Sequence, residues 1–261
     1  MVIRLRFQAA VKTRSLFTRC CHFVYGKFLF AVPKNIRKKI FKGTRNYCPI
    51  CSSHLRKFLP LYRPYHSWCP ICQSLARHRF VWHYFQHATL PRDGQNLRIL
   101  HIAPEKAIQD FFQTIPGVEY LSGDLVNKSA MVKMDICNIN YPDESFDLIF
   151  CSHVLEHVED DRQALREFHR VLSSHGQLML MVPIMGEVTI EDPSVTDPAE
   201  REHLYGQLDH VRAYGLDFPK IVSSQGFKVQ TFEPKSYLND AQIQEQAIDT
   251  TDRLFVCTPS L

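Results

Sequence analysis

The chain has 261 residues, of which 45% are hydrophobic and 22% are charged, a balance that excludes wholesale disorder. Its glycines and prolines are too few for a collagen-like or low-complexity chain, and no run of about 18 uncharged apolar residues predicts a membrane-spanning helix. The net charge of +4 is divided unevenly, because the first acidic residue is Asp93. Residues 1–92 carry a net charge of +18 and the rest of the chain carries −14, which predicts two modules that meet near residues 91–94.

The charge asymmetry has two interpretations. The basic half could dock on the acidic half and neutralise it, or it could present a basic surface to an anionic lipid, glycan or nucleic acid. In the basic extension, residues 1–47, a predicted helix over residues 35–42 places Ile36 and Ile40 on one side and most of its basic residues elsewhere. This pattern is typical of a helix at an anionic membrane surface, and equally of a helix that packs on its own protein.

Two copies of the sequence Cys-Pro-Ile-Cys, Cys48 to Cys51 and Cys69 to Cys72, are separated by 17 residues. Each copy can present two thiolates from a tight turn, and two such turns complete a tetrahedral site for Zn²⁺. Four thiolates leave no open position, so the spacing predicts a structural zinc. A redox or disulfide pair is the alternative. Reduced cysteines with zinc predict a cytoplasmic protein, with residues 1–47 peripheral at the inner membrane surface if the membrane interpretation holds.

From residue 97 onward, short apolar runs alternate with amphipathic helices. The expected strands cover residues 98–103, 118–121, 132–136, 146–151, 177–182, 226–232 and 253–257, and the expected helices cover 74–87, 107–113 and 160–172. This alternation predicts a doubly wound, mainly parallel α/β sheet. We therefore expect a basic extension (1–47), a zinc-ribbon module with a linking helix (48–92) and an α/β domain (93–261).

Ligands of such sheets bind beyond the carboxyl ends of the strands, and polar side chains follow the first two strands there. The first strand ends at His101 and continues through Ala103 to Glu105. The second strand ends at Asp124, whose carboxylate could accept hydrogen bonds from both hydroxyls of a ribose.

The next two strands also end in candidate binding residues. Asp135 and Ile136 follow the third strand and suit an adenine amino group and an apolar wall. Ser152 and His153 follow the fourth strand, where they could face a cofactor or an acceptor.

These strand ends together resemble the class I S-adenosylmethionine-dependent methyltransferases. Residues 141–158 are similar to the fourth motif of that family, and residues 172–183 to the turn into its fifth strand. The cysteine pairs, with residues 191–197 and 206–214, resemble a bacterial subgroup that has an N-terminal zinc ribbon and is associated with surface-glycan pathways. The resemblance implies a Rossmann-like sheet of seven strands with the last antiparallel, S-adenosylmethionine as cofactor, and a small-molecule or glycan acceptor.

The first loop departs from that family, whose loops are usually rich in glycine because the backbone approaches the cofactor closely. Here the loop is Ala103, Pro104 and Glu105, and Glu105 could engage the methionyl amino group instead. The alternative is a non-catalytic binding module of the same fold for an anionic partner. The absence of a GxGxxG motif after the first strand argues against a dinucleotide enzyme.

Residues 185–215 are polar and longer than a simple connection, which predicts a lid on the acceptor side; a solvated loop is the alternative. His210 with Asp209 is the expected acid/base pair, and His153 is a further catalytic candidate, because a neutral histidine can take a proton from a hydroxyl group. Residues 153–157 also match HxxEH, the motif of inverted zinc peptidases, but the preceding strand favours the methyltransferase interpretation.

Overall fold

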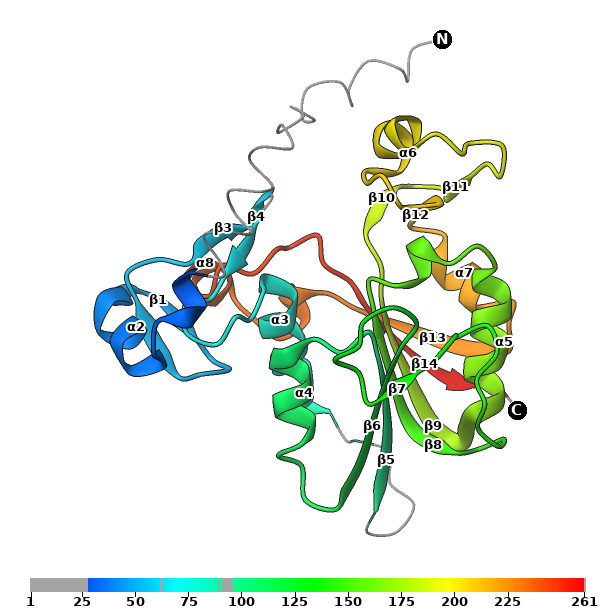
Figure 1. Cartoon of the computed structure of the whole chain (residues 1–261), viewed down its shortest axis with the longest axis horizontal. Helices are drawn as coiled ribbons and strands as arrows, with labels where there is room; N and C mark the ends of the chain where they lie inside the picture. The colour runs from blue at the N-terminus through cyan, green and yellow to red at the C-terminus, as the bar shows by residue number, and fades with distance from the viewer. Residues whose placement is uncertain (1–27, 62, 89, 91–95, 261) are drawn as a thin grey trace.

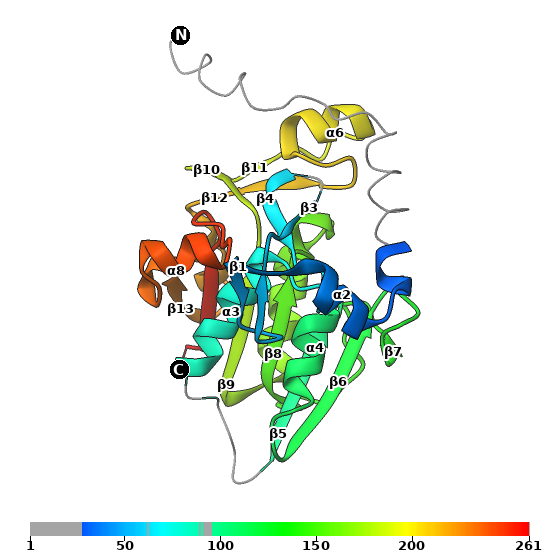
Figure 2. The same cartoon turned by 90° about the vertical axis from the view of Figure 1, so that its left-hand side faces the viewer.

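The computed structural model describes residues 28–61, 63–88, 90 and 96–260 (Figures 1 and 2). They form three parts: a ribbon lobe (residues 28–75), an α/β domain, and a lid (residues 184–215) that lies above one edge of the main sheet. Within these residues, no helix has both the length and the apolar character needed to cross a membrane. The first 27 residues of the predicted basic extension lie outside the described residues.

The main sheet has seven strands in the order β13-β14-β9-β8-β5-β6-β7. In chain order they are β5 (Leu97–Ile102), β6 (Val118–Asp124), β7 (Val132–Lys133), β8 (Phe146–Ser152), β9 (Leu172–Met181), β13 (Phe227–Phe232) and β14 (Leu254–Pro259). The pairs among β5 to β9 are parallel, and β14 runs antiparallel to both of its neighbours. The predicted seven-stranded sheet with an antiparallel last strand is therefore confirmed.

Helices cover both faces of this sheet, as Figure 1 shows. One face carries α5 (Asp161–Val171) and α7 (Phe218–Ser223), and the other carries α3 (Ala76–His87), α4 (Lys106–Phe112) and α8 (Asp240–Glu245). The α3 side chains Phe80, Val81 and Phe85 are buried against the sheet, since their spacing places them on one side of the helix. The linking helix of the basic module is thus part of the core of the α/β domain.

The ribbon lobe contains α2 (Lys34–Phe41) and two antiparallel hairpins, β1 (Lys42–Cys48) with β2 (Ser53–Leu55), and β3 (Leu59–Leu61) with β4 (Arg63–Trp68). Its apolar cluster includes Leu29 and Phe41 in addition to residues that follow Cys48. The packed lobe therefore begins well before residue 48, where the sequence places the start of the zinc-ribbon module.

Helix α2 turns a different face to the lobe than its apolar pattern predicts. Ile36 and Ile40 are 44% and 49% exposed, whereas Arg37 is buried. The Arg37 guanidinium donates hydrogen bonds to the backbone carbonyls of Pro70 (2.5 Å) and Ile71 (2.8 Å). These bonds satisfy a buried cation at the second Cys-Pro-Ile-Cys turn, and they leave the isoleucines on the outside beside exposed lysines.

The lid is a folded lobe rather than an open loop. It contains β10 (Ile184–Gly186), β11 (Ile190–Glu191), α6 (Pro198–Tyr205) and β12 (Arg212–Gly215), with the strands in the order β10-β12-β11. Asp197 caps α6 by accepting hydrogen bonds from two backbone N–H groups of its first turn. Gly206 ends the helix in the left-handed conformation (φ 88°), which glycine adopts without strain.

Arg212 fixes the lid on the loop that follows β8. This side chain is 1% exposed, and its guanidinium donates to the carbonyl of Leu155 (2.9 Å) and pairs with Glu191 (2.6 Å). Two residues further on, the Tyr214 hydroxyl donates to the buried carboxylate of Asp161 (2.5 Å). Buried charges of this kind are stable only with their partners in place, so the lid has one defined position over the β8 loop.

Candidate functional site

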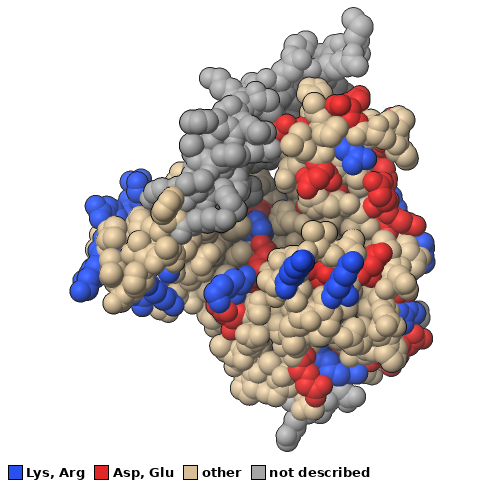
Figure 3. All heavy atoms as spheres, viewed as in Figure 1, with Lys and Arg blue, Asp and Glu red and all other residues tan. Residues whose placement is uncertain are grey.

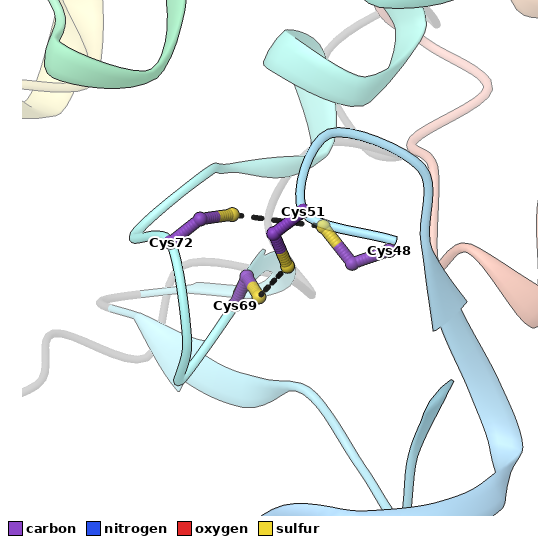
Figure 4. A group of neighbouring side chains, drawn as sticks. All are labelled: Cys48, Cys51, Cys69 and Cys72. Atoms are coloured by element: carbon purple, nitrogen blue, oxygen red, sulfur yellow. Dashed lines mark hydrogen bonds between the residues drawn. The ribbon is translucent and has the colours of Figure 1, made fainter. Parts of the chain in front are cut away.

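The four cysteines of the two Cys-Pro-Ile-Cys turns converge in the ribbon lobe, as Figure 4 shows. The Sγ atoms of Cys48 and Cys72 are 3.7 Å apart, those of Cys51 and Cys69 are 3.8 Å apart, and all four lie within 4.8 Å of one another. In a tetrahedral zinc–thiolate site with bonds of about 2.3 Å, the sulfurs are separated by about 3.8 Å. The cluster therefore has the dimensions of a four-thiolate zinc site.

The backbone explains why two distant pairs form one cluster. Ser52 and Gln73 each follow the second cysteine of a copy, and both adopt the left-handed conformation (φ 49° and 67°), so the two copies make the same turn. Arg37 and the buried Arg79 lie near the sulfurs. Cations beside thiols favour the deprotonated form that binds metal.

A second group of candidate residues lies at the carboxyl edge of the parallel strands. β5 pairs with β6 on one side and with β8 on the other, which makes the space beyond β5 and β8 the switch point of the sheet. Ala103 follows β5 and His153 follows β8, and both have positive φ angles (48° and 55°). Non-glycine residues held in this region cluster at functional sites.

Glu105 connects the first loop to α3. Its Oε1 pairs with Arg77 and with Nε2 of His78 (2.9 Å). Its Oε2 is buried and has no hydrogen-bond partner among the residues that the structure describes. Burial opposes ionisation, but the charges of Arg77 and His78 hold the pKa of Glu105 well below its usual value, so the free oxygen belongs to a carboxylate that can accept a hydrogen bond.

His101, which the sequence places among the cofactor-binding residues, is fully covered by protein. Its Nδ1 lies 3.0 Å from the Tyr120 hydroxyl, and its Nε2 accepts a hydrogen bond from the N–H of Glu105 (3.4 Å). Burial lowers the pKa of His101 to about 3, so the ring is neutral. His101 therefore supports the first loop through the N–H of Glu105, and its contact with a cofactor stays a prediction.

The remaining predicted cofactor residues lie along the same edge. Asp124 is half-buried, and its Oδ1 accepts two N–H groups of the following turn, both at 2.7 Å. Asp135 is exposed, whereas Ile136 is 6% exposed and packs in the core. The Oγ of Ser152 is buried without a hydrogen-bond partner in the described part of the chain.

The predicted catalytic residues occupy a third place, between the lid and the loop after β8. Glu156 and His157 lie on the 3₁₀ turn η1 (Leu155–His157), and their ligand atoms lie within 4.8 Å of one another and of His210. Asp209 is exposed, and its carboxylate lies 3.3 Å from Nδ1 of His157. The structure therefore pairs Asp209 with His157, whereas Nδ1 of His210 bonds to the carbonyl of Tyr205 (2.9 Å).

His153 is 25% exposed, and its Nδ1 lies 3.2 Å from Oε1 of Glu156. Burial opposes ionisation of Glu156, but this contact with His153 keeps the pKa of Glu156 below its usual value. Because His153 is left-handed and precedes η1, the two histidines of the HxxEH segment do not share a helical face. A peptidase motif of the inverted type needs that shared face.

Asp252 is an acidic residue with a buried carboxyl oxygen at the same edge of the sheet, and the sequence pattern does not single it out. It precedes β14, which begins at the edge where the parallel strands end because it runs antiparallel to β9. Its Oδ2 is buried and has no hydrogen-bond partner within the described residues. Burial raises the pKa of Asp252 to about 6, although His153, Arg77 and Arg79 act in the opposite direction. The predicted antiparallel last strand was the one signal that pointed to this position.

Parts of the chain are similar to known methyltransferases. Residues 109–180 match the family model described as a methyltransferase domain. The chain is 32% identical over 79 residues to the uncharacterized methyltransferase YcgJ of Bacillus subtilis (30% of each protein), and 28% identical over 102 residues to an ajmaline N-methyltransferase of Rauvolfia serpentina (39% of this chain, 33% of that protein). The family model and the names of these two relatives denote methyltransferases, and each match covers only part of the chain.

The matches cover only part of each relative. The chain spans about a third of the length of these curated relatives. A further relative is an uncharacterized 37.1 kDa protein of a Streptomyces fradiae transposon. The chain is 31% identical to it over 116 residues, which are 44% of this chain and 34% of that protein. Among solved structures, YcgJ aligns with a TM-score of 0.46 at 17% identity (69% of this chain, 97% of that one). An S-adenosylmethionine-dependent methyltransferase of Archaeoglobus fulgidus aligns with a TM-score of 0.45 at 16% identity (70% and 91%).

We expect Asp252→Asn to raise the free energy of unfolding near pH 8 by about 1–3 kcal/mol. The Asp252 carboxyl has a pKa of about 6 in the folded protein, against an ordinary value of 3.8, so the folded state binds the proton more tightly than the unfolded chain does. The stability that the protonated Asp252 carboxyl contributes is therefore fully present below about pH 4, and it is lost as the pH rises through about 6. Urea denaturation of both proteins across this range measures the effect. Asp240→Asn, at a position where the side chain is 79% exposed, serves as the control. If wild type and Asp252→Asn showed parallel dependence of stability on pH, the raised pKa of Asp252 would be contradicted.

Proposed function

We propose that the chain is an S-adenosylmethionine-dependent methyltransferase that acts on a small-molecule or glycan acceptor. The observation that carries the proposal is the set of buried polar atoms at the switch point of the sheet. Glu105 Oε2 and Ser152 Oγ are buried and lack partners within the described chain, and buried polar atoms are rarely left unpaired. The match of residues 109–180 to a methyltransferase domain supports the same conclusion.

The residues present fit the cofactor group by group. Glu105 Oε2 would accept a hydrogen bond from the methionyl ammonium, and Asp124 would accept the ribose hydroxyls at the end of β6. Asp135 would accept the adenine amino group beside the apolar wall of Ile136, and Ala103 with Ser152 would line the loop between β5 and β8. When bound, S-adenosylmethionine supplies an electrophilic methyl group on its sulfonium.

We assign the proton transfer to His153. Its ring is partly exposed at the end of β8, and Glu156 holds its Nδ1, so the second ring nitrogen can take the proton that an acceptor hydroxyl or amine loses as the methyl group moves. His210 is 2% exposed and Asp209 contacts His157. These two candidates would therefore act on the acceptor through His157 and Glu156 rather than by direct contact.

Asp124→Asn should weaken binding of S-adenosylmethionine at least tenfold, because each charge-assisted hydrogen bond to the ribose contributes about 1.5–3 kcal/mol. The amide keeps an oxygen for the two N–H groups that Asp124 Oδ1 accepts, so the turn is preserved. Calorimetric titration of the full chain measures the affinity. Asp110→Asn on α4, where the side chain is 57% exposed, should bind as wild type does.

The same titration separates the two classes of function. If the wild-type chain releases no heat with S-adenosylmethionine, the non-catalytic binding module is the better description. If Asp124→Asn binds as tightly as wild type, the ribose assignment is wrong.

We also propose that Cys48, Cys51, Cys69 and Cys72 bind one structural zinc. Cys72→Ser should lose one equivalent of zinc and lower the melting temperature, because a structural zinc contributes directly to folding. Cys137→Ser, at a half-buried cysteine outside the cluster, should keep both. Elemental analysis of protein purified under reducing conditions gives the stoichiometry, and an unchanged zinc content in Cys72→Ser would refute the site.

A further proposal is that the ribbon lobe contacts an anionic surface. On the face that Figure 3 shows, Lys and Arg gather over the left-hand lobe, which contains α2, whereas Asp and Glu are frequent on the lid and along the right-hand side of the view. On α2, the exposed Ile36 and Ile40 stand among exposed lysines, the combination that inserts into an anionic bilayer. Residues 1–27 of the basic extension lie outside the described residues.

Reversing charge at Lys38 and Lys39 should weaken sedimentation with anionic vesicles at least tenfold, since each basic residue near such a surface contributes about 1 kcal/mol. Substitution is a cleaner test than truncation, because Arg37 and Phe41 pack inside the lobe. Reversal at the exposed Lys228 and Lys235, outside the lobe, provides the matched control. Equal binding of neutral and anionic vesicles by the wild-type chain would count against the proposal.

A further inference from the structure

We propose that Glu156, His157 and His210 form a second metal site, distinct from the four cysteines, that binds a divalent first-row transition ion. One ligand atom of each residue lies within 4.8 Å of the others. Ligand atoms around an ion with bonds of about 2.0–2.2 Å are roughly 3–4 Å apart, so the three atoms need to close by no more than about 1–2 Å. The residues come from η1 and from the segment before β12.

His210 is already arranged as a metal ligand. Its ring is 2% exposed, and Nδ1 lies 2.9 Å from the carbonyl oxygen of Tyr205, a contact in which Nδ1 must carry the proton and donate. In the neutral ring Nε2 then bears the lone pair, and it is buried without a hydrogen-bond partner among the described residues. Metal-binding histidines almost always donate their other ring N–H to a carbonyl or a carboxylate in this way.

Glu156 likewise has one side-chain oxygen with a partner and one without. Its side chain is 1% exposed, and Oε1 lies 3.2 Å from Nδ1 of His153. Oε2 is buried and, in the described part of the chain, unpartnered. The cluster that Glu156 and His210 form with His157 thus contains two buried atoms that lack a partner within the described chain, Glu156 Oε2 and His210 Nε2, and an ion held between these residues would give both a partner.

His157 provides the side from which an ion can enter. Its side chain is 33% exposed, and its ring meets that of His210 edge-on with centroids 4.7 Å apart. Two imidazoles with one carboxylate suit Zn²⁺, Fe²⁺ or related ions better than Mg²⁺ or Ca²⁺, which prefer oxygen ligands. Three protein ligands leave coordination positions open, so the ion could also hold an oxygen of a bound molecule.

The backbone holds the three residues in place from both elements. The N–H of Val211 donates to the carbonyl of Glu156 (2.9 Å), and Arg212 donates to the carbonyl of Leu155 (2.9 Å). These bonds join η1 to the start of β12, so Glu156 and His210 cannot separate without breaking the attachment of the lid. Such a rigid arrangement reduces the conformational cost of binding an ion.

The test is a titration of the full chain, with its cysteine site loaded and any histidine tag removed, with Zn²⁺ and with Co²⁺. Wild-type protein should take up one further equivalent of metal. His157→Ala and Glu156→Gln should each lower the affinity for that equivalent about 100-fold. Because the new site has no thiolate, the added Co²⁺ should lack the intense thiolate-to-metal charge-transfer band that a cysteine site produces.

His203→Ala is the matched control, since it removes an exposed histidine of the same lid and should leave the second equivalent unchanged. Glu156→Gln keeps the shape of the side chain, so it decides the outcome if His157→Ala unfolds. The proposal is overturned if wild type takes up no metal beyond the cysteine site, or if both variants bind as wild type does. Metal uptake is measured without S-adenosylmethionine, so its failure would leave the proposed methyltransferase function untouched.

Discussion

A carboxylate that is buried without a cation costs several kcal/mol, and Glu105 avoids this cost through Arg77 and His78. The pairing joins α3, which begins at the ribbon lobe, to the first loop beyond β5. It also explains how a loop without glycine keeps a tight turn. Ala103 is held in the left-handed conformation between the last residue of β5 and a glutamate that α3 fixes from outside, so the turn is stabilised by a neighbouring helix and not by backbone freedom.

The lid is likewise held in place by a buried charge that needs partners, here beside the loop after β8. Arg212 has almost no contact with solvent, and its partners are Glu191 of the lid and carbonyls of the β8 loop. Because this guanidinium cannot be left unpaired, the lid is attached where His153 and Glu156 emerge from β8. The two attachments, at Glu105 and at Arg212, thus fix the loop after β5 and the loop after β8, which carry candidate cofactor and acceptor residues.

The features that depend on local pattern could be predicted from the sequence. Apolar runs predicted the seven strands of the sheet to within a few residues, and the repeated Cys-Pro-Ile-Cys turn predicted the meeting of four sulfurs. Features that depend on contacts between distant segments could not. The orientation of α2 follows from the bonds of Arg37 to carbonyls more than thirty residues away, and the pairing of Asp209 with His157 follows from how the lid sits on η1.

The basic residues of the N-terminal part differ in burial and in the partners that the fold gives them. Some arginines of the N-terminal part have their partners inside the protein. Arg77 pairs with Glu105. The buried Arg79 donates hydrogen bonds to the carbonyls of Gln246 (2.6 Å) and Ala247 (3.0 Å), beside α8. Among the residues that the structure describes, the exposed lysines of α2 have no such partner. The arginines of α3 thus dock onto the C-terminal part, as the first interpretation of the asymmetry expects, while the exposed lysines of α2 are the residues on which the proposed anionic surface depends.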